Sequence, residues 1–294
     1  MNDRFQELTV FVRAADTGSF SAAARDLGLS QPSVSRIVSE LEARLGIKLL
    51  LRSTRRIVPT EAGLAFLSKA RQILYDLEDA DESARGIDSL RGVLRVALPS
   101  VLGIRILIPG LPLFLKDYPQ LKIEFLMSDN MQDLVAEGAD LAIRFGRMSD
   151  SGFGARKLAS LERMLVASPA YLAARGAPAT PADLVQHDLI VGPLVASNWP
   201  WSFERDGRVD TVKVEPRFLL NSAEAAIASA SHGLGLARAS ALMCRDELAS
   251  GQLVQALPGY ALEAVDLHAV FPAGRTPSQK VRLFTAFVSQ LLAR

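Results

Sequence analysis

Residues 20–45, FSAAARDLGLSQPSVSRIVSELEARL, contain two short helical patterns separated by a tight turn. Alanines dominate the first pattern, so that another helix can cross it closely, and Gly28 ends it. Ser30 is a good N-cap for the second pattern, and Pro32 falls in its first turn, where the missing N–H costs nothing. The apolar positions of the second pattern recur at helical spacing: Val34, Ile37 and Val38, Leu41, and Leu45. Two short helices joined in this way predict a helix-turn-helix.

The polar side chains of the second helix gather near its N-terminal end, where a recognition helix meets base edges in the major groove. Glutamine can bond adenine bidentately, arginine can take guanine or a phosphate, serine suits either, and proline can contact a thymine methyl. An ordinary amphipathic helix with a solvated polar face is the alternative interpretation. The candidate DNA-binding residues of this helix are Gln31, Pro32, Ser33, Ser35 and Arg36.

A helical pattern precedes this motif, and a predicted hairpin follows it. The helix ends at Gly18 and has apolar residues three and four positions apart: Phe5, Leu8, Val12 and Ala15. The hairpin spans residues 49–60, where two β-prone runs flank the polar tip 53–56. Its arginines suit a wing that follows the DNA backbone or enters the minor groove, the alternative being a solvated hairpin: Arg52, Arg55 and Arg56.

The order of these motifs resembles the whole N-terminal domain of LysR-type transcriptional regulators. The matching stretches are FSAAARDL (20–27), SQPSVSR (30–36), LE (41–42), LG (45–46), Arg52 to Arg56 and TEAG (60–63). The resemblance implies base or backbone contacts from Gln31, Pro32, Ser35 and Arg36, and wing contacts from Arg52, Arg55 and Arg56. Leu50 and Pro59 stand where the family more often has phenylalanine and leucine, which are apolar exchanges at packing positions.

Charge and composition agree with this interpretation. Residues 1–60 carry a net charge of +3, residues 61–90 of −4 and residues 91–294 of +2, so the basic excess lies where DNA contact is expected. A chain of 294 residues that is 49% hydrophobic suits two or three globular domains. Cys244 is the one cysteine and the three histidines are scattered, so we expect no intrachain disulfide, metal site or cofactor.

The opening segment is amphipathic and lacks the pattern of a secretory leader. No apolar run reaches the roughly 18 residues of a membrane span. We therefore expect a cytoplasmic protein with no membrane partner.

Residues 61–90 are predicted to form a long linker helix after the DNA-binding domain, residues 1–60. Thr60 can cap this helix, and Pro59 prevents it from extending backward. Its narrow apolar seam is spaced for a partner helix: Leu67, Ala70, Leu74 and Leu77. The partner is either a neighbouring subunit or the chain's own body. The resemblance implies a dimerising linker, giving a homodimer and frequently a homotetramer.

Residues 91–294 alternate strand-like and helix-like runs, which favours parallel α/β layers. Predicted strands are 93–98, 121–126, 140–145, 163–167 and 265–271, with β structure around 199–219. Predicted helices are 101–115, 130–136, 169–175, 181–186, 222–232 and 277–292. The last strand and helix are expected to return to the first half.

Four stretches of this region resemble the effector-binding domain of the same family: YP (118–119), DLAIR (140–144), ASPAYL (167–172) and GLG (233–235). The resemblance implies the two-lobed fold of periplasmic solute-binding proteins. Lobe I is then about 91–162 and 268–294, and lobe II about 163–267. The whole chain is thus predicted to be an α/β protein with a winged helix-turn-helix, a linker helix and a two-lobed effector-binding domain.

Ligands in such lobes bind where strands end and helices begin. Pro99-Ser100-Val101 follows the first strand, Ser128-Asp129 the second, and Asn221-Ser222 precedes a helix of the other lobe. Arg144 can pair with an anionic ligand or with a structural carboxylate. Family analogy suggests an effector, by default a small organic anion, bound by Ser100, Val101, Ser128, Arg144, Asn221 and Ser222, although serine and asparagine are also ordinary helix caps.

An α/β enzyme, or a solute-binding domain fused to a DNA-binding module, is the alternative function. The GLG stretch lacks the third glycine of a dinucleotide fingerprint, and no phosphate loop, nucleophile elbow or histidine metal motif occurs. No catalytic or metal-binding residue is therefore predicted. We expect a regulator that binds double-stranded DNA and responds to a small-molecule effector.

Overall fold

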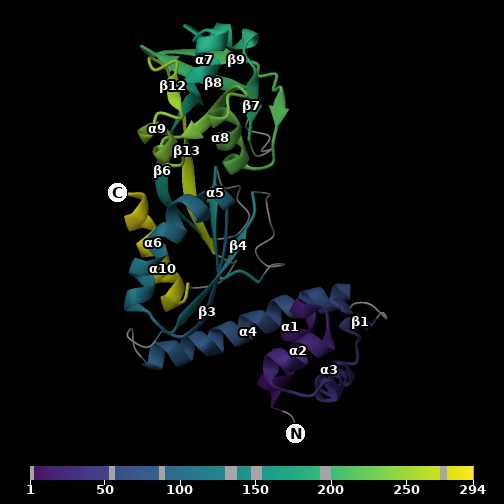
Figure 1. Cartoon of the computed structure of the whole chain (residues 1–294). Helices are drawn as coiled ribbons and strands as arrows, with labels where there is room; N and C mark the ends of the chain where they lie inside the picture. Colours follow the sequence, from purple (N-terminus) through teal and green to yellow (C-terminus); the bar gives the residue numbers. More distant parts are fainter. Residues whose placement is uncertain are drawn as a thin grey trace. The chain divides into compact units, whose positions relative to one another are not determined.

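The computed structural model describes residues 3–52, 57–85, 90–129, 138–146, 154–192, 200–271 and 277–293 (Figure 1). The chain divides into two compact units, Met1–Ser89 and Leu90–Arg294.

Three short helices form the body of the N-terminal unit, as the sequence predicts. They are α1 (Arg4–Thr17), α2 (Phe20–Leu27) and α3 (Gln31–Leu45). At each start the side chain of the N-cap residue accepts a hydrogen bond from a backbone N–H of the first turn: Asp3, Ser19 and Ser30. A glycine in the left-handed region ends each helix: Gly18, Gly28 and Gly46.

The core of this unit confirms the predicted face of α3 and, except for Phe5, that of α1. In α3 the predicted positions are buried except Leu45, which is 37% exposed: Val34, Ile37, Val38 and Leu41. In α1, Leu8 is buried and Val12 and Ala15 pack against the core, but Phe5 is 42% exposed and Phe11 is fully buried instead. Phe11 packs edge-on against Phe66 of α4 (Glu61–Arg85), with ring centroids 5.3 Å apart. The inward face of α1 is therefore decided by its tertiary partner.

The predicted hairpin consists of β1 (Leu50–Arg52) and β2 (Ile57–Pro59). The two strands pair antiparallel, with Leu51 opposite Val58. The predicted tip, residues 53–56, lies outside the described residues.

The long helix α4 begins in close contact with this wing. Thr60 Oγ1 accepts a hydrogen bond from the Gly63 N–H at 2.9 Å, which confirms the predicted cap. A Cβ atom on Gly63 would lie 2.0 Å from the Leu49 carbonyl oxygen. Only glycine therefore allows the first turn of α4 to approach the wing so closely.

Part of the predicted seam of α4 is covered by the chain's own body. Leu67 and Ala70 are buried in the core of the N-terminal unit, and Leu74 packs against that core. Leu77, by contrast, is 40% exposed. Together with the exposed Ile73 and Ala80 it forms a row at helical spacing, here called the α4 stripe.

A mixed sheet runs through the C-terminal unit in the strand order β10-β7-β11-β6-β13-β5-β3-β4, with β8, β9 and β12 attached beside it. Its strands are β3 (Gly92–Leu98), β4 (Leu121–Met127), β5 (Leu141–Phe145), β6 (Gly154–Ala167), β7 (Leu189–Val191), β8 (Trp201–Arg205), β9 (Arg208–Val212), β10 (Phe218–Leu219), β11 (Leu236–Ser240), β12 (Val254–Ala256) and β13 (Ala261–Phe271). Its helices are α5 (Ser100–Leu102), the π-helical turn η2 (Gly103–Leu107), α6 (Ile108–Asp117), α7 (Pro169–Arg175), the 3-10 helix η3 (Pro181–Gln186), α8 (Ala223–Ser231), α9 (Arg245–Ala249) and α10 (Gln279–Leu292).

The sheet belongs to two lobes that the long antiparallel strands β6 and β13 connect (Figure 1). In lobe I, β3 pairs in parallel with β4 and β5; in lobe II, β7 pairs in parallel with β10 and β11. The last strand, β13, returns to pair with β5, as the sequence predicts. This is the predicted two-lobed α/β architecture.

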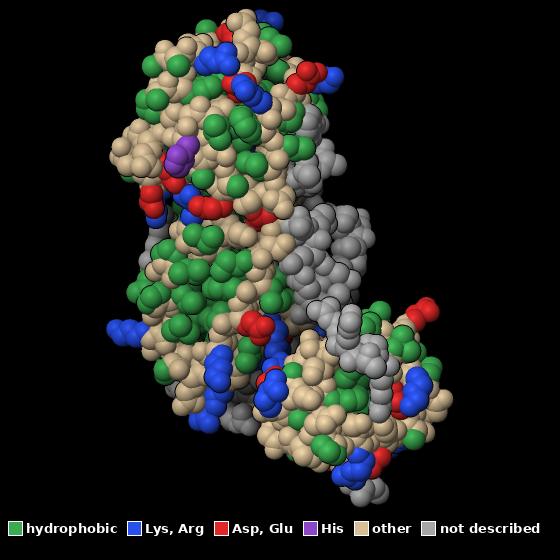
Figure 2. All heavy atoms as spheres, turned by 45° about the vertical axis from the view of Figure 1, so that its right-hand side comes forward, with side chains coloured by type: hydrophobic (Ala, Val, Ile, Leu, Met, Phe, Trp, Pro, Cys, Tyr) green, Lys and Arg blue, Asp and Glu red, His purple; other side chains and the backbone are tan. Residues whose placement is uncertain are grey.

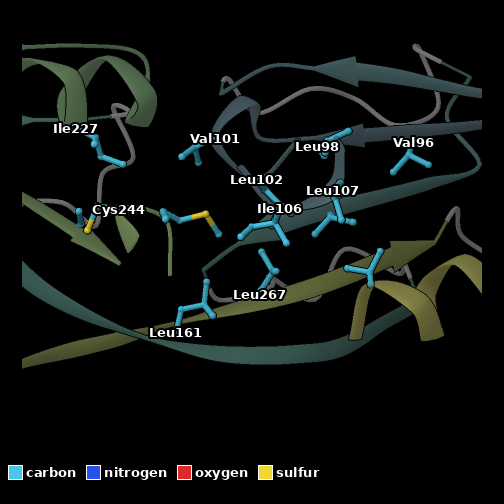
Figure 3. Packing of buried hydrophobic residues seen from close by; sticks show 14 of the residues in the cluster. Val96, Leu98, Val101, Leu102, Ile106, Leu107, Leu161, Ile227, Cys244 and Leu267 are labelled. Atoms are coloured by element: carbon cyan, nitrogen blue, oxygen red, sulfur yellow. The ribbon is translucent and has the colours of Figure 1, made fainter. Parts of the chain in front are cut away.

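One apolar core extends through both lobes (Figure 3). Leu98 and Leu107 of lobe I, Leu161 of β6, and Ile227 and Cys244 of lobe II belong to the same cluster of buried residues. The polar residues that join the lobes therefore lie beside an apolar core that both lobes share.

Several short or exposed elements differ from the prediction. β6 begins at Gly154 instead of residue 163, because residues 154–157 are all exposed and show no alternation of polar and apolar side chains. The sequence does not predict β7, β11, β12 or α9, which are three to five residues long and carry too little periodicity. The predicted helix 130–136 lies outside the described residues.

Candidate functional site

The N-terminal end of α3 presents the predicted recognition residues on its open side. Gln31, Pro32 and Arg36 are exposed, and Ser33 and Ser35 are half-buried. Ser30 Oγ accepts a hydrogen bond from the Ser33 N–H at 3.2 Å, which fixes the first turn of the helix. Because the opposite face is buried in the core, these polar groups can enter a groove without disturbing the fold.

Arg36 provides a positive charge on the exposed face of α3. Its side chain is 64% exposed, and its Nη1 donates a hydrogen bond to Glu40 Oε1 at 3.2 Å, one turn along the helix. A guanidinium carries five N–H donors in a fixed fork. The bond to Glu40 uses one of them, and the fork geometry of the group suits a bidentate contact to guanine or phosphate.

The buried carboxylate of Glu42 ties α3 to the wing. It accepts hydrogen bonds from the N–H groups of Leu49 at 3.0 Å and Leu50 at 3.1 Å, and from Lys48 Nζ at 2.6 Å. Burial alone would raise the pKa of Glu42, but the bonds from Lys48, Leu50 and Leu49 outweigh it, so that the pKa lies below its usual value. Glu42 thus sets where the wing begins relative to the recognition helix.

The predicted wing contacts are not described in atomic detail. Arg55 and Arg56, and the side chain of Arg52, lie outside the described residues.

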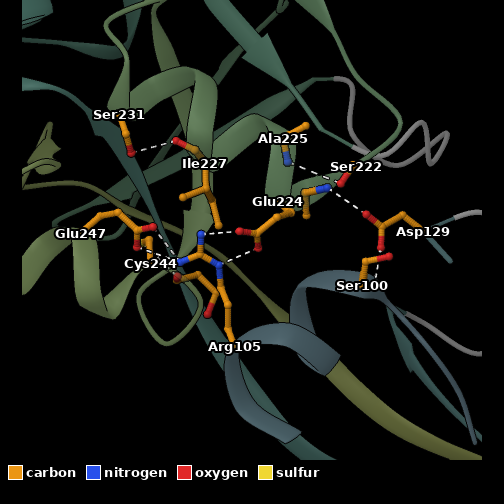
Figure 4. A network of polar contacts seen from close by, with 12 residues as sticks. Ser100, Arg105, Asp129, Ser222, Glu224, Ala225, Ile227, Ser231, Cys244 and Glu247 are labelled. Carbon is orange, nitrogen blue, oxygen red and sulfur yellow. Dashed lines mark hydrogen bonds and ion pairs between the residues drawn. The ribbon is translucent and has the colours of Figure 1, made fainter. Parts of the chain in front are cut away.

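In the C-terminal unit, Asp129 joins the beginnings of two helices from different lobes (Figure 4). Its Oδ1 accepts a hydrogen bond from the Ser100 N–H at 2.7 Å, at the start of α5 in lobe I. Its Oδ2 accepts one from the Ala223 N–H at 3.1 Å, at the start of α8 in lobe II. Within lobe II, Ser222 Oγ caps α8 by accepting a bond from the Ala225 N–H at 3.4 Å.

Arg105 of η2 forms a second connection between the lobes. Its Nε and Nη2 each donate to Glu224 of α8 at 2.6 Å, and its Nη1 donates to both carboxylate oxygens of Glu247 of α9 at 2.8 Å. The hydrogen bonds to Glu224 raise the pKa of Arg105; burial opposes the rise, and Glu247 adds to it. Figure 2 shows acidic and basic side chains gathered at the level where the two lobes meet.

The structure brings only some of the predicted effector residues together. The Ser100 N–H bonds to Asp129, which Ser128 precedes, and Ser222 precedes Ala223, whose N–H bonds to the same carboxylate. Asn221 is exposed beside Ser222. The side chain of Val101 is 1% exposed in the apolar core, so only its backbone can meet a ligand.

Arg144 lies on a different strand of lobe I. It sits on β5 opposite His268 of β13 and takes no part in the Asp129 bonds.

A small hollow lies beside Arg105. It is also lined by Leu242, Met243, Arg245 and Asp246 and has a volume of about 10 Å³. That is room for about one water molecule and not for an organic effector.

Other kinds of site are not found among the described residues. No group of three or more histidine, cysteine, aspartate or glutamate side chains is arranged to hold a metal ion there. Over the same residues, every helix is too short or too polar to cross a membrane.

Two family models match the chain, one on each unit. Residues 5–64 match the model described as bacterial regulatory helix-turn-helix protein, lysR family, and residues 88–293 match the LysR substrate binding domain. The chain belongs to the LysR family of transcriptional regulators.

Relatives of this LysR-type regulator match it over nearly their whole length. PtxR of Pseudomonas aeruginosa is 33% identical over 288 residues, which cover 98% of this chain and 92% of PtxR. The solved structure of CrgA from Neisseria meningitidis has a TM-score of 0.64 and 30% identity, covering 99% of both chains. The full-length structure of the Vibrio cholerae virulence activator AphB has a TM-score of 0.61 and 28% identity, covering 98% of both.

Family membership gives the two units of this regulator their roles. The helix-turn-helix binds DNA, and the two-lobed unit is the effector-binding domain. Because full-length relatives are named transcriptional regulators, the alternative of an α/β enzyme or a solute-binding domain fused to a DNA-binding module is not favoured.

Sequence reasoning missed the residues that join the lobes, namely Arg105, Glu224 and Glu247, and assigned no role to Asp129. One signal was present for Arg105, which is the only charge in the apolar segment 101–115. A charged side chain in such a segment needs a partner, but nothing in the sequence identifies two glutamates more than a hundred residues away.

Proposed function

We propose that this LysR-type regulator recognises a specific duplex through α3 and the wing. Gln31, Pro32, Ser33, Ser35 and Arg36 contact base edges and the neighbouring backbone, while Arg52, Arg55 and Arg56 contact the flanking groove. The observation that supports this most is the exposed polar N-terminal end of α3 on a helix whose opposite face is buried. A protein with this role acts at the chromosome, in the cytoplasm.

We propose that the regulator works as a homodimer through the α4 stripe. Ile73, Leu77 and Ala80 are exposed at helical spacing, so a second copy of the same helix can cover them. A second apolar surface supports a homotetramer, because lobe I exposes Ile104 at 46%, Ile108 at 47% and Leu113 at 53%. Two winged helices in one dimer would read two half-sites.

The effector is proposed to be a small organic anion that binds between the lobes. Ser100, Val101, Ser128, Asn221 and Ser222 surround the beginnings of α5 and α8, whose N–H groups suit a carboxylate, and Arg144 supplies a further cation. Binding shifts the angle between the lobes only to the extent that the effector prefers one arrangement. The linker helix then changes the spacing of the two DNA-binding domains.

Selection from a random duplex library tests DNA recognition by the full-length protein. We expect an enriched sequence with two half-sites one or more helical turns apart, and affinity that falls as a power of the salt concentration. A library that stays random through repeated rounds, with weak binding to every duplex, would contradict the proposal.

Thermal unfolding tests the class of effector. We expect at least one member of a panel of small carboxylic acids to raise the Tm of the protein, whereas the matched neutral amide does not. Equal shifts from acid and amide, or none from any acid, would contradict an anionic effector.

A further inference from the structure

Asp129 performs two functions with one carboxylate. The first N–H groups of a helix have no acceptor within the helix, so each needs one from elsewhere. Asp129, at the end of β4, supplies one oxygen to Ser100 of its own lobe and the other to Ala223 of lobe II, at 2.7 and 3.1 Å. Separating the lobes would leave the Ala223 N–H to water and the carboxylate with only one of its two partners.

Arg105 acts on the same turn of α8. Its guanidinium is bidentate on Glu224, the residue after Ala223, and it also holds Glu247. The side chains of Arg105 and Glu247 are only 16% and 15% exposed, so solvent screens this pair weakly. Lobe I therefore binds the first turn of α8 through two side chains from different elements, one anionic and one cationic (Figure 4).

We propose that Asp129 and Arg105 form an inter-lobe latch that holds the cleft shut in the absence of effector. The hydrogen bonds support this, because Asp129 and Arg105 each bond to lobe II from lobe I, so the lobes cannot part without breaking these bonds. This proposal rests on the proposed binding of effector between the lobes. It adds that the latch regulates that binding.

The latch has a consequence for affinity. When the binding-competent state is only a fraction of the population, the apparent affinity is reduced by that fraction. The effector must therefore overcome the bonds of Asp129 and Arg105, and a variant without Asp129 is more often open before any effector arrives.

The experiment measures lobe separation in the effector-free, full-length protein. Spin labels are placed on Lys116→Cys, exposed on α6 of lobe I, and Val185→Cys, 82% exposed on η3 of lobe II. Cys244 is fully buried and stays unlabelled. Labelled protein is diluted with an excess of unlabelled protein, so that pulsed electron paramagnetic resonance reports distances within one chain.

We expect a single narrow distance distribution in the labelled parent protein and an additional or broadened component in Asp129→Ala. Ser168→Ala is the matched control, because it removes a helix cap that lies wholly within lobe II, at the start of α7. Its distribution should equal that of the parent. A distribution in Asp129→Ala that also equals the parent's would overturn the latch.

Hydrogen exchange of Asp129→Asn gives a second readout if the alanine variant does not fold. Asparagine keeps the size of the side chain but replaces one of the two accepting oxygens by an NH2 group, which only donates, so one of the two N–H groups loses its acceptor. We expect the amides of α5 and of the first turn of α8 to exchange about tenfold faster than in the wild type. Unchanged exchange would overturn the proposal. Neither experiment uses DNA or effector, so a result that overturns the latch would leave the proposed function intact.

Discussion

Glu42, near the end of the recognition helix, accepts a hydrogen bond from the backbone N–H of Leu50 at the start of the wing, at 3.1 Å. The same carboxylate accepts one from Leu49 and is only 2% exposed. Recognition helix and wing are therefore joined by a buried acid, and the contacts of both with DNA depend on it.

Replacing Glu42 by alanine should loosen the wing. Two buried N–H groups lose their acceptor, and each such loss costs about 1–3 kcal/mol. Hydrogen exchange in residues 45–60 measures the free energy of local unfolding of the wing. This free energy should fall by an amount of this size. Glu40→Ala, which removes an exposed acid of the same helix, should change it by less than about 0.5 kcal/mol. Equal effects of the two variants would contradict the role of Glu42.

The contribution of Glu42 to the stability of the wing should depend on pH. The folded pKa of Glu42 lies below its ordinary value of 4.5, so its contribution to stability is present above about pH 4.5 and lost as the pH falls below it. The difference in opening free energy between wild type and Glu42→Gln should therefore shrink on acidification through this range. A difference that stays constant from pH 7 to below the folded pKa would argue against it.

Gly63→Ala should separate α4 from the wing. The new Cβ would lie 2.0 Å from the Leu49 carbonyl oxygen, so the backbone must move, at a cost of about 1–3 kcal/mol. Gly154→Ala is the control, because its nearest neighbour would be 3.7 Å away. The Tm for unfolding of the N-terminal unit should fall in Gly63→Ala and not in Gly154→Ala. An unchanged transition in both would show that the close approach is not needed.

Charges on the α4 stripe should dissociate the proposed dimer. Ile73→Glu with Leu77→Glu places two carboxylates in the surface that a second copy would cover, and unpaired charges there are costly. Sedimentation should show a smaller assembly than the wild type, whereas Val185→Glu, at an 82% exposed apolar position elsewhere, should leave it unchanged. Identical sedimentation of all three proteins would contradict the assignment of this surface.

Cys244 should be chemically inert in the folded protein. It is fully buried, and burial, with the charge of Glu247 next, raises its pKa to about 11. At pH 7.5 the reactive thiolate is thus a small fraction, and reagent must also reach the core. Alkylation should be at least about 100-fold slower than in urea-unfolded protein. Comparable rates would mean that this part of lobe II opens readily.

The sequence predicts the N-terminal unit closely because its signals are local. Ser30, Gly28 and Pro32 decide where α3 begins through interactions within a few residues, and its apolar spacing decides its buried face. Phe11 shows the limit, because it is buried through Phe66 of a distant helix, which no local spacing reveals.

The effector cleft was less predictable because its contacts are long-range. Ser100 and Ser222 were candidates because they sit where strands give way to helices, which a sequence shows. The pairing of Asp129 with Ala223 joins residues 94 positions apart, and that of Arg105 with Glu247 joins residues 142 apart. Such pairs form only once the two lobes have folded beside each other.

The most direct test of the account compares the wild type with Arg36→Ala on a selected duplex and on its scrambled version, over a salt series. Lys116→Ala, an exposed lysine of lobe I, is the control for lost charge. Arg36→Ala should weaken binding to the selected duplex by about 1–3 kcal/mol, roughly 5- to 150-fold, and reduce its preference over the scrambled one, while Lys116→Ala behaves as wild type. If Arg36→Ala retained full affinity and preference, α3 would not be the element that reads the sequence, and the central claim would be wrong.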